Sequence, residues 1–174
     1  MITLDRNLLD RAAQLPRISE DYGDDSQDYT SPPIFPDMVI DGFRLIGSGC
    51  ERTVWLGPDG YAYKVQAYDG GANYEEWRRS LILRANPKLP CWVYIPETAY
   101  DDVTKIAVAE FIRGEQPWHC YYDTCECPGS VCRWEMASEA FDYCGSVDGH
   151  AGNCVIVDGN SPDDFIVAVI DFTR

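Results

Sequence analysis

Residues 147–153 read Val-Asp-Gly-His-Ala-Gly-Asn, and residues 169–172 read Val-Ile-Asp-Phe. Asp148 stands five residues before Asn153, and Asp171 follows Asn153 by 18 residues at the end of an apolar run. The apolar segments between them flank a turn and predict a β-hairpin. Because Mg²⁺ is bound in proteins by carboxylate and carbonyl oxygens, Asn153 and Asp171 are candidate magnesium ligands, and Asp148 is left to orient a nucleophilic hydroxyl.

A glycine-containing segment lies far upstream of this stretch. Residues 47–54 read Gly-Ser-Gly-Cys-Glu-Arg-Thr-Val, between two strand-like segments. Glycine lets the backbone approach a phosphate closely and offer its N–H groups, so Gly47 and Gly49 are candidate phosphate-binding residues. A Gly-x-Gly between strands is also what an ordinary turn requires, and this pair alone does not separate the two interpretations.

Lys64 lies in the next strand-like segment, where apolar neighbours allow it to point inward. A buried ammonium group needs a carboxylate or phosphate partner, whereas a solvent-facing lysine needs none. The helix expected over 73–85, with Asn73 as its cap, supplies two candidate partners, Glu75 and Glu76. A solvated helix face is the alternative interpretation of both glutamates.

The rest of the chain supplies the elements around these motifs. Strands are expected over 43–46, 53–56, 61–67, 91–95 and 106–112, helices over 3–15, 73–85 and 133–144, and a final hairpin over 155–157 and 165–171. Residues 19–37 are acidic and rich in turn formers, which predicts a linker or surface arm. The expected fold class is α+β.

In this order, the pieces resemble the protein-kinase signature: a Gly-rich loop, a strand lysine, a helix glutamate, an Asp-x-x-x-x-Asn loop and an Asp-Phe pair. The closest resemblance is to the aminoglycoside-phosphotransferase branch and to small phage-type kinase-like proteins, whose catalytic loops often read Asp-x-His-x-x-Asn. It covers residues 43–174, about three quarters of the chain. The resemblance implies a kinase-like N-lobe, an antiparallel sheet plus one helix, over 41–113. A minimal C-lobe with a Cys-rich insert would occupy 114–174, after an N-terminal helix and acidic arm over 1–40.

The resemblance also implies a role for each matching residue. Gly47 and Gly49 would cover the phosphates of ATP. Lys64 would hold the α- and β-phosphates and pair with Glu76, with Glu75 as the fallback. The remaining groups would be the hinge facing adenine at Glu110 and Ile112, the catalytic base Asp148, and the Mg²⁺ ligands Asn153 and Asp171.

Three positions and the end of the sequence depart from the family pattern. Arg52 stands at the third glycine of the phosphate loop, Ser146 at the His of His-Arg-Asp, and Thr173 at the Gly of Asp-Phe-Gly. The sequence ends at Arg174, so no activation segment or later C-lobe helix is expected within it. Nucleotide binding is therefore the stronger expectation, and phosphorylation of a peptide in the usual manner the weaker one.

Four of the eight cysteines fall within a 13-residue segment, at Cys120, Cys125, Cys127 and Cys132. Four thiolates could hold Zn²⁺ and stabilise an irregular loop, although Cys-x-Cys is not the usual knuckle spacing. Disulfide pairing is the alternative, and the sequence leaves both open. The other four, which are Cys50, Cys91, Cys144 and Cys154, lie on or beside apolar segments and are expected to be buried as small hydrophobic residues.

The net charge is −15, from 29 acidic and 14 basic residues. A chain this acidic repels nucleic acid and anionic membrane surfaces, and it suits a small ligand carried with its metal ion or a basic protein partner. Residues 1–16 are charged and lack the apolar core of a signal peptide, so a reducing cytoplasmic location is expected.

These observations favour a minimal kinase-like protein that binds ATP with Mg²⁺ and transfers the γ-phosphoryl group to an unknown acceptor. One alternative is a catalytically weak or inactive binding protein on the same scaffold, a phage-type effector or inhibitor that acts on a host protein. A weaker alternative is a nucleic-acid mimic that uses the acidic residues 20–28, although such charge usually serves only solubility.

Overall fold

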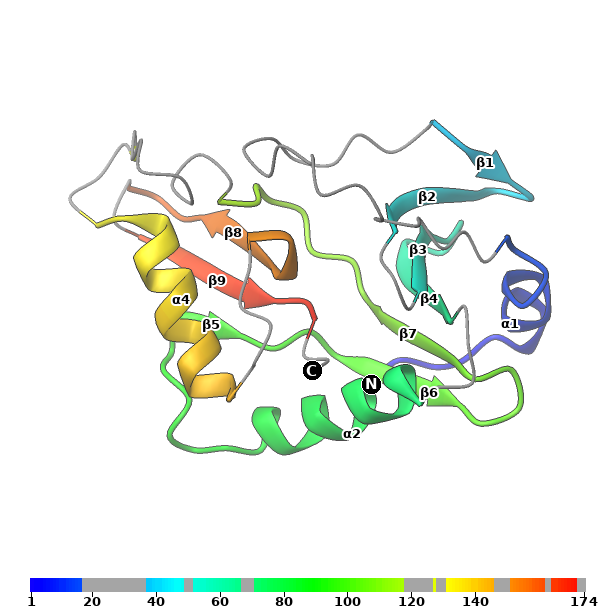
Figure 1. Cartoon of the computed structure of the whole chain (residues 1–174), viewed down its shortest axis with the longest axis horizontal. Helices are drawn as coiled ribbons and strands as arrows, with labels where there is room; N and C mark the ends of the chain where they lie inside the picture. The colour runs from blue at the N-terminus through cyan, green and yellow to red at the C-terminus, as the bar shows by residue number, and fades with distance from the viewer. Residues whose placement is uncertain are drawn as a thin grey trace, which may run out of the picture. The chain divides into compact units, whose positions relative to one another are not determined.

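The computed structural model describes residues 1–16, 37–48, 52–66, 71–117, 127, 131–145, 151–161 and 164–171. They form two compact units of an α+β protein (Figure 1). Unit 1 holds the described residues within 1–16, 37–78 and 97–111, and unit 2 holds those within 79–96 and 112–171. The helix α2, Ala72–Arg84, contributes residues up to Arg78 to unit 1 and the remainder to unit 2.

Unit 1 is built on a six-stranded antiparallel sheet in the order β1-β2-β3-β4-β7-β6. The strands are β1 Val39–Ile40, β2 Phe43–Ser48, β3 Arg52–Leu56, β4 Tyr61–Gln66, β6 Thr98–Asp101 and β7 Ile106–Glu110. Because side chains alternate along a strand, the sheet presents two different faces. β2, β3 and β4 precede α2 and β7 follows it, as the sequence predicts, whereas β1 and β6 were not expected.

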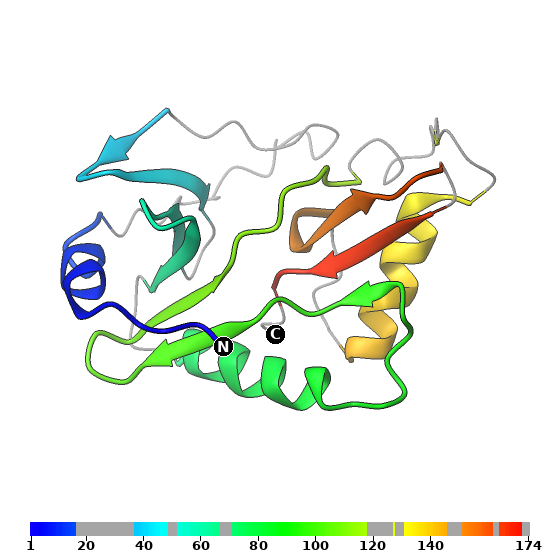
Figure 2. The same ribbon diagram turned by 180° about the vertical axis from the view of Figure 1, so that it is seen from behind.

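One face of this sheet is apolar and packs against the N-terminal helix α1, Arg6–Ala12, to form a core (Figure 2). Ile2, Leu9, Ala12 and Leu15 are all less than a tenth exposed, and they cluster with side chains of β2, β3, β4 and β7. Phe43 and Tyr63 meet edge to face, with 5.1 Å between ring centroids. Asp5 begins the helix by accepting the N–H of Asn7 at 2.8 Å.

An ion pair between the exposed Arg6 and the buried Asp101 ties the N-terminal segment to β6. Arg6 Nη2 donates to Asp101 Oδ1 at 2.7 Å and Nη1 to Oδ2 at 3.1 Å. The Arg6 guanidinium lowers the pKa of Asp101 to about 2; desolvation opposes this, and hydrogen bonds from Thr104 reinforce it. Since the folded-state pKa lies below the unfolded value, the pair stabilises the fold above pH 4 or so and is lost as the pH falls toward 2.

We therefore expect the free energy of unfolding to fall between about pH 4 and pH 2, and to fall less steeply in Asp101→Asn. Urea denaturation at a series of pH values measures both curves. The surface carboxylate Asp102, which pairs with Lys105 at 2.7 Å, provides the matched control as Asp102→Asn. Parallel curves for the wild type and Asp101→Asn would contradict the assignment.

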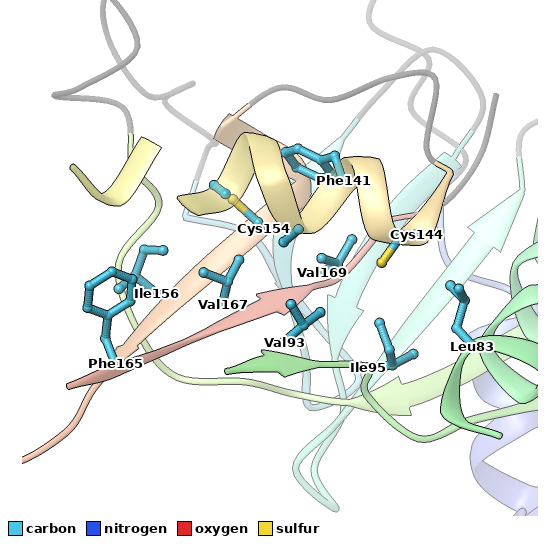
Figure 3. Close-up of a cluster of buried hydrophobic side chains, with 12 residues drawn as sticks. Leu83, Val93, Ile95, Phe141, Cys144, Cys154, Ile156, Phe165, Val167 and Val169 are labelled. Atoms are coloured by element: carbon cyan, nitrogen blue, oxygen red, sulfur yellow. The ribbon is translucent and has the colours of Figure 1, made fainter. Parts of the chain in front are cut away.

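Unit 2 packs the helix α4, Arg133–Cys144, on a three-stranded sheet in the order β5-β9-β8. The strands are β5 Val93–Tyr94, β8 Cys154–Asp158 and β9 Phe165–Val169, and a 3-10 turn at Ala151–Asn153 precedes β8. Figure 3 shows the core between them, in which Val167 and Val169 of β9 lie beneath Phe141 and the two buried cysteines. Gly145 ends α4 in the left-handed conformation at φ 60°, as a C-cap glycine does.

The structure differs from the sequence prediction around residues 91–101. The strand expected over 91–95 is shorter in the structure, where only β5, Val93–Tyr94, is extended. This strand pairs parallel to β9 in the second sheet. The neighbour of β7 is β6, which the sequence did not predict. The polar residues at the end of β6 are typical of a loop in sequence. In the structure, Asp101 closes the hairpin of β6 and β7 by accepting the N–H and the hydroxyl of Thr104, both at 2.7 Å.

Among the described helices, none combines the length and apolar character that crossing a membrane would require.

Candidate functional site

Lys64 lies at the centre of the sheet face that is opposite to the α1 core. It pairs in register with Val54 on one side and Ala107 on the other, and Gly47 follows beyond Val54. Ala62 and Ala109, which pair with each other, form the next row toward the other end of β4. Alanines and Val54 are therefore the neighbours of the lysine on this face of the sheet.

Glu76 of α2 is the partner of Lys64. Lys64 Nζ lies 2.5 Å from Glu76 Oε1, and the two residues are only 5% and 1% exposed. The alternative partner, Glu75, is instead on the surface, where it pairs with Arg78 at 2.9 Å. The structure thus brings together two of the predicted site residues and selects between the two glutamates.

Arg52 is a third member of this cluster, which sequence reasoning missed. Its Nη1 lies 2.6 Å from Glu76 Oε2, and the residue is 5% exposed. Within the described residues Oε2 has no hydrogen bond of standard geometry, so the contact with Arg52 is chiefly electrostatic. Strand alternation gives the missing signal, because Arg52 shares a face of β3 with Val54, the register partner of Lys64.

Asn73 holds the cluster in place from the first turn of α2. Its Nδ2 donates to the carbonyls of Lys64 at 2.6 Å and Lys105 at 2.9 Å, and its Oδ1 accepts from Arg52 at 3.3 Å. The expected role as helix cap is therefore wrong. Gly71, at φ 76°, takes that place because its carbonyl accepts the N–H of Glu75 at 3.0 Å.

Gly47 is not required by the backbone. A Cβ at this position would lie 3.4 Å from Val54 Cβ, a distance that needs little adjustment, and Gly47 is not among the glycines with positive φ. The turn interpretation of this glycine therefore has no support from its own conformation. Its role in phosphate binding stays a prediction.

In unit 2, the hairpin brings the two predicted magnesium ligands to the same end. Cys154 pairs with Val169, and the next backbone contact is the N–H of Ile170 donating to the carbonyl of Asn153 at 2.9 Å. Asn153 is therefore the acceptor of this hydrogen bond, and Asp171 follows its donor directly in the chain. Asn153 is 7% exposed and Asp171 is half-buried.

The segment 114–116, which follows β7, is hydrogen-bonded to β8 and to the turn before it. Glu115 exchanges two backbone hydrogen bonds with Ile156, at 2.7 and 3.0 Å, and Gln116 Nε2 donates to the carbonyl of Gly152 at 3.0 Å. Gly114 is needed here, because a Cβ would lie 2.2 Å from the carbonyl oxygen of Ile156.

The predicted hinge residues lie at the end of β7 and just after it. The N–H of Glu110 donates to the carbonyl of Glu97 at 2.9 Å, and its carboxylate accepts the N–H of Glu97 at 2.7 Å. Ile112 follows, half-buried. The backbone N–H of Glu110 is thus used within the sheet, and the role of Glu110 and Ile112 as a hinge facing adenine stays a prediction.

Several predicted site residues lie outside the described part of the chain: Gly49, Asp148, Cys120 and Cys125. Of the other two cysteines in that segment, Cys127 Sγ accepts the backbone N–H of Arg133 at 3.2 Å, and Cys132 precedes α4. No group of three or more metal-ligating side chains occurs in the described ranges.

The remaining cysteines divide between the core and the surface. Cys144 and Cys154 are buried as expected, and burial raises the pKa of their thiols to about 11 and about 12. Cys91 is exposed, contrary to expectation, because it lies in the turn before β5. Cys50 lies outside the described residues.

Comparisons with known proteins give partial similarities of fold. No family model matches the chain, and no curated protein matches it. An aminoglycoside phosphotransferase, seen in the streptomycin-ATP-APH(2")-IIa ternary complex, is 17% identical with a TM-score of 0.35, over 66% of this chain and 32% of that one.

The second type of similar structure is the PknI kinase domain of Mycobacterium tuberculosis, 15% identical with a TM-score of 0.41, over 80% of this chain and 63% of that one. A further phosphotransferase, in the GDP and kanamycin complex of APH(2")-IIia, is 16% identical with a TM-score of 0.37, over 64% of this chain and 42% of that one. The chain therefore spans less than two thirds of each of these structures. These similarities are partial, and each TM-score is below 0.5.

Proposed function

We propose that this protein binds ATP together with Mg²⁺ and uses it for phosphoryl transfer, with unit 1 as a kinase-like N-lobe and unit 2 as a minimal C-lobe. The observation that carries the proposal is the buried ion pair of Lys64 and Glu76 on a sheet face of small side chains. The order of strands around α2 supports the same assignment.

The physical reason is the cost of burying charge. Removing an ammonium and a carboxylate from water costs several kcal/mol per ion, and their mutual attraction often does no more than offset this. A buried Lys–Glu pair is therefore a poor device for stability alone. A lysine held at a fixed position beside alanines is well suited to a phosphate, which it binds as a point charge.

The donor set in unit 2 fits Mg²⁺, because an amide oxygen and a carboxylate are hard oxygen ligands. Asn153 and Asp171 are the proposed ligands, and the hairpin keeps their backbones together at one end. A bound Mg²⁺ would neutralise phosphate charge. Asp148, the proposed base, would orient the acceptor hydroxyl and take its proton.

Lys64→Met is expected to weaken binding of Mg·ATP by about 30-fold or more, since one charge-assisted phosphate contact is lost. Isothermal titration calorimetry with and without Mg²⁺ measures this for the wild type and the variant. Lys88→Met is the matched control because Lys88 is exposed, and it should bind as the wild type does. Equal affinities for all three proteins, or no binding by the wild type, would overturn the proposal.

Binding and transfer can be separated with two further variants. Asp171→Asn is expected to weaken the Mg²⁺-dependent part of ATP binding. Asp148→Asn should leave ATP binding nearly unchanged and lower ATP turnover, because a base acts on the acceptor and not on the nucleotide. Binding without any turnover in the wild type would support a binding protein on this scaffold over a phosphotransferase.

A further inference from the structure

Arg52 occupies an unexpected place in the cluster of unit 1. It begins β3 and pairs in register with Gln66, whose Oε1 accepts the backbone N–H of Asn73 at 3.1 Å. Its guanidinium contacts Glu76 at 2.6 Å and Asn73 at 3.3 Å. The backbone of Arg52 is therefore fixed by β4, and its guanidinium by two residues of α2.

The two cations divide the carboxylate of Glu76 between them. Lys64 Nζ contacts Oε1 at 2.5 Å, and Arg52 Nη1 contacts Oε2 at 2.6 Å. A carboxylate shared in this way attracts each cation more weakly than it would attract a single partner, because the second cation already compensates part of its charge. Arg52 thereby reduces the cost of moving Lys64 Nζ toward another anion.

We propose that Arg52 is a positioning residue for phosphate binding: it holds and neutralises Glu76, so that the ammonium of Lys64 can be shared with a phosphate of the ligand. This inference rests on the proposed function. Arg52 acts through Glu76 and Lys64, and it does not itself contact the ligand. Without Arg52, Glu76 and Lys64 form a closed one-to-one pair.

Asn73 gives the arrangement its rigidity. It is fully buried and links Arg52 to the carbonyl of Lys64 itself, at 2.6 Å. The same amide thus fixes the backbone that carries the lysine and the guanidinium that carries the charge of Glu76. Arg52 is thus in contact with Glu76 directly and with the backbone of Lys64 through Asn73.

The test is a double-mutant cycle on the full chain with Mg·ATP as the probe, measured by calorimetry at a temperature where all variants are folded by circular dichroism. Arg52→Met should weaken binding about ten-fold in the wild-type background and less than two-fold in the Lys64→Met background. Arg52→Lys, which keeps the charge, should recover most of the affinity.

Two results would overturn the inference. Equal losses in both backgrounds would overturn it, because Arg52 would then contact the phosphate itself or act independently of Lys64. A lower melting temperature with unchanged affinity would also overturn it, since Arg52 would then serve only the fold. Failure of the proposed function is distinguishable, because it would be seen as absent binding in the wild type before any Arg52 variant is compared.

Discussion

Glu76→Ala is expected to lower the free energy of unfolding by about 3–5 kcal/mol, the usual cost of leaving a buried charge without its partner. The carboxylate is 1% exposed and compensates both Arg52 and Lys64, so its removal leaves two cations on the α2 face of the sheet. Urea denaturation followed by circular dichroism measures the loss. Glu75→Ala is the matched control: the neighbouring glutamate pairs only at the surface, with Arg78, and should change stability by less than about 0.5 kcal/mol.

Replacing Arg52, Lys64 and Glu76 together with apolar residues tests whether their charges serve the fold or the ligand. The triple variant Arg52→Met, Lys64→Met and Glu76→Leu is expected to recover most of the stability that Glu76→Ala loses, because buried ion clusters often contribute no more than well-packed apolar side chains of similar volume. The triple variant should nevertheless bind no Mg·ATP. Recovered stability without binding would mean that the cluster serves the ligand. A triple variant as unstable as Glu76→Ala would mean that it serves the fold.

The sequence predicted the elements of unit 1 well where alternation and turns were strong. The expected strands over 43–46, 53–56 and 61–67 became β2, β3 and β4 with shifts of one or two residues, and the helix over 73–85 became α2. Between β3 and β4 the expected turn is present, and the N–H of Gly60 donates to the carbonyl of Gly57 at 3.0 Å. Lys64 was identified as a candidate because its apolar strand neighbours allow it to point inward, with a solvent-facing lysine as the alternative.

The partners of Arg52 and Asn73 could not be recognised from local pattern. An arginine after a glycine-rich loop usually faces solvent, and an asparagine at a helix start is usually a cap. Both residues are buried here because they bond to each other and to groups from other parts of unit 1: Arg52 contacts Glu76 of α2, and Asn73 donates to the carbonyls of Lys64 in β4 and of Lys105 just before β7. Such partners are distant in sequence, and only the register of the sheet brings them together.

The local sequence pattern also could not predict the surface on which the N-terminal helix packs. An amphipathic segment over 3–15 predicts an apolar stripe but not the surface that the stripe covers. In the structure this surface is the core face of the sheet, where Trp55 and Phe43 have no exposed area and Tyr63 is 1% exposed. The helix is therefore part of the fold of unit 1.

Leu9→Ala is accordingly expected to lower the free energy of unfolding by about 2–5 kcal/mol, the range for truncating a fully buried leucine. Leu9 is 1% exposed and packs in the core between α1 and the sheet. Leu81→Ala is the matched control. Leu81 lies on α2 with half of its surface exposed, and alanine is as good a helix former, so this variant should stay within about 0.5 kcal/mol of the wild type.

The same variant separates the two faces of the sheet. Leu9 lies on the face opposite to Lys64, so its truncation should leave the contacts of Glu76 with Lys64 and Arg52 unchanged. At a temperature where Leu9→Ala is still folded, its affinity for Mg·ATP should match that of the wild type, although its urea midpoint is lower. Equal stability of Leu9→Ala and Leu81→Ala would contradict the role of α1 in the core. A loss of affinity in the folded variant would instead mean that the two faces are coupled through the strands between them.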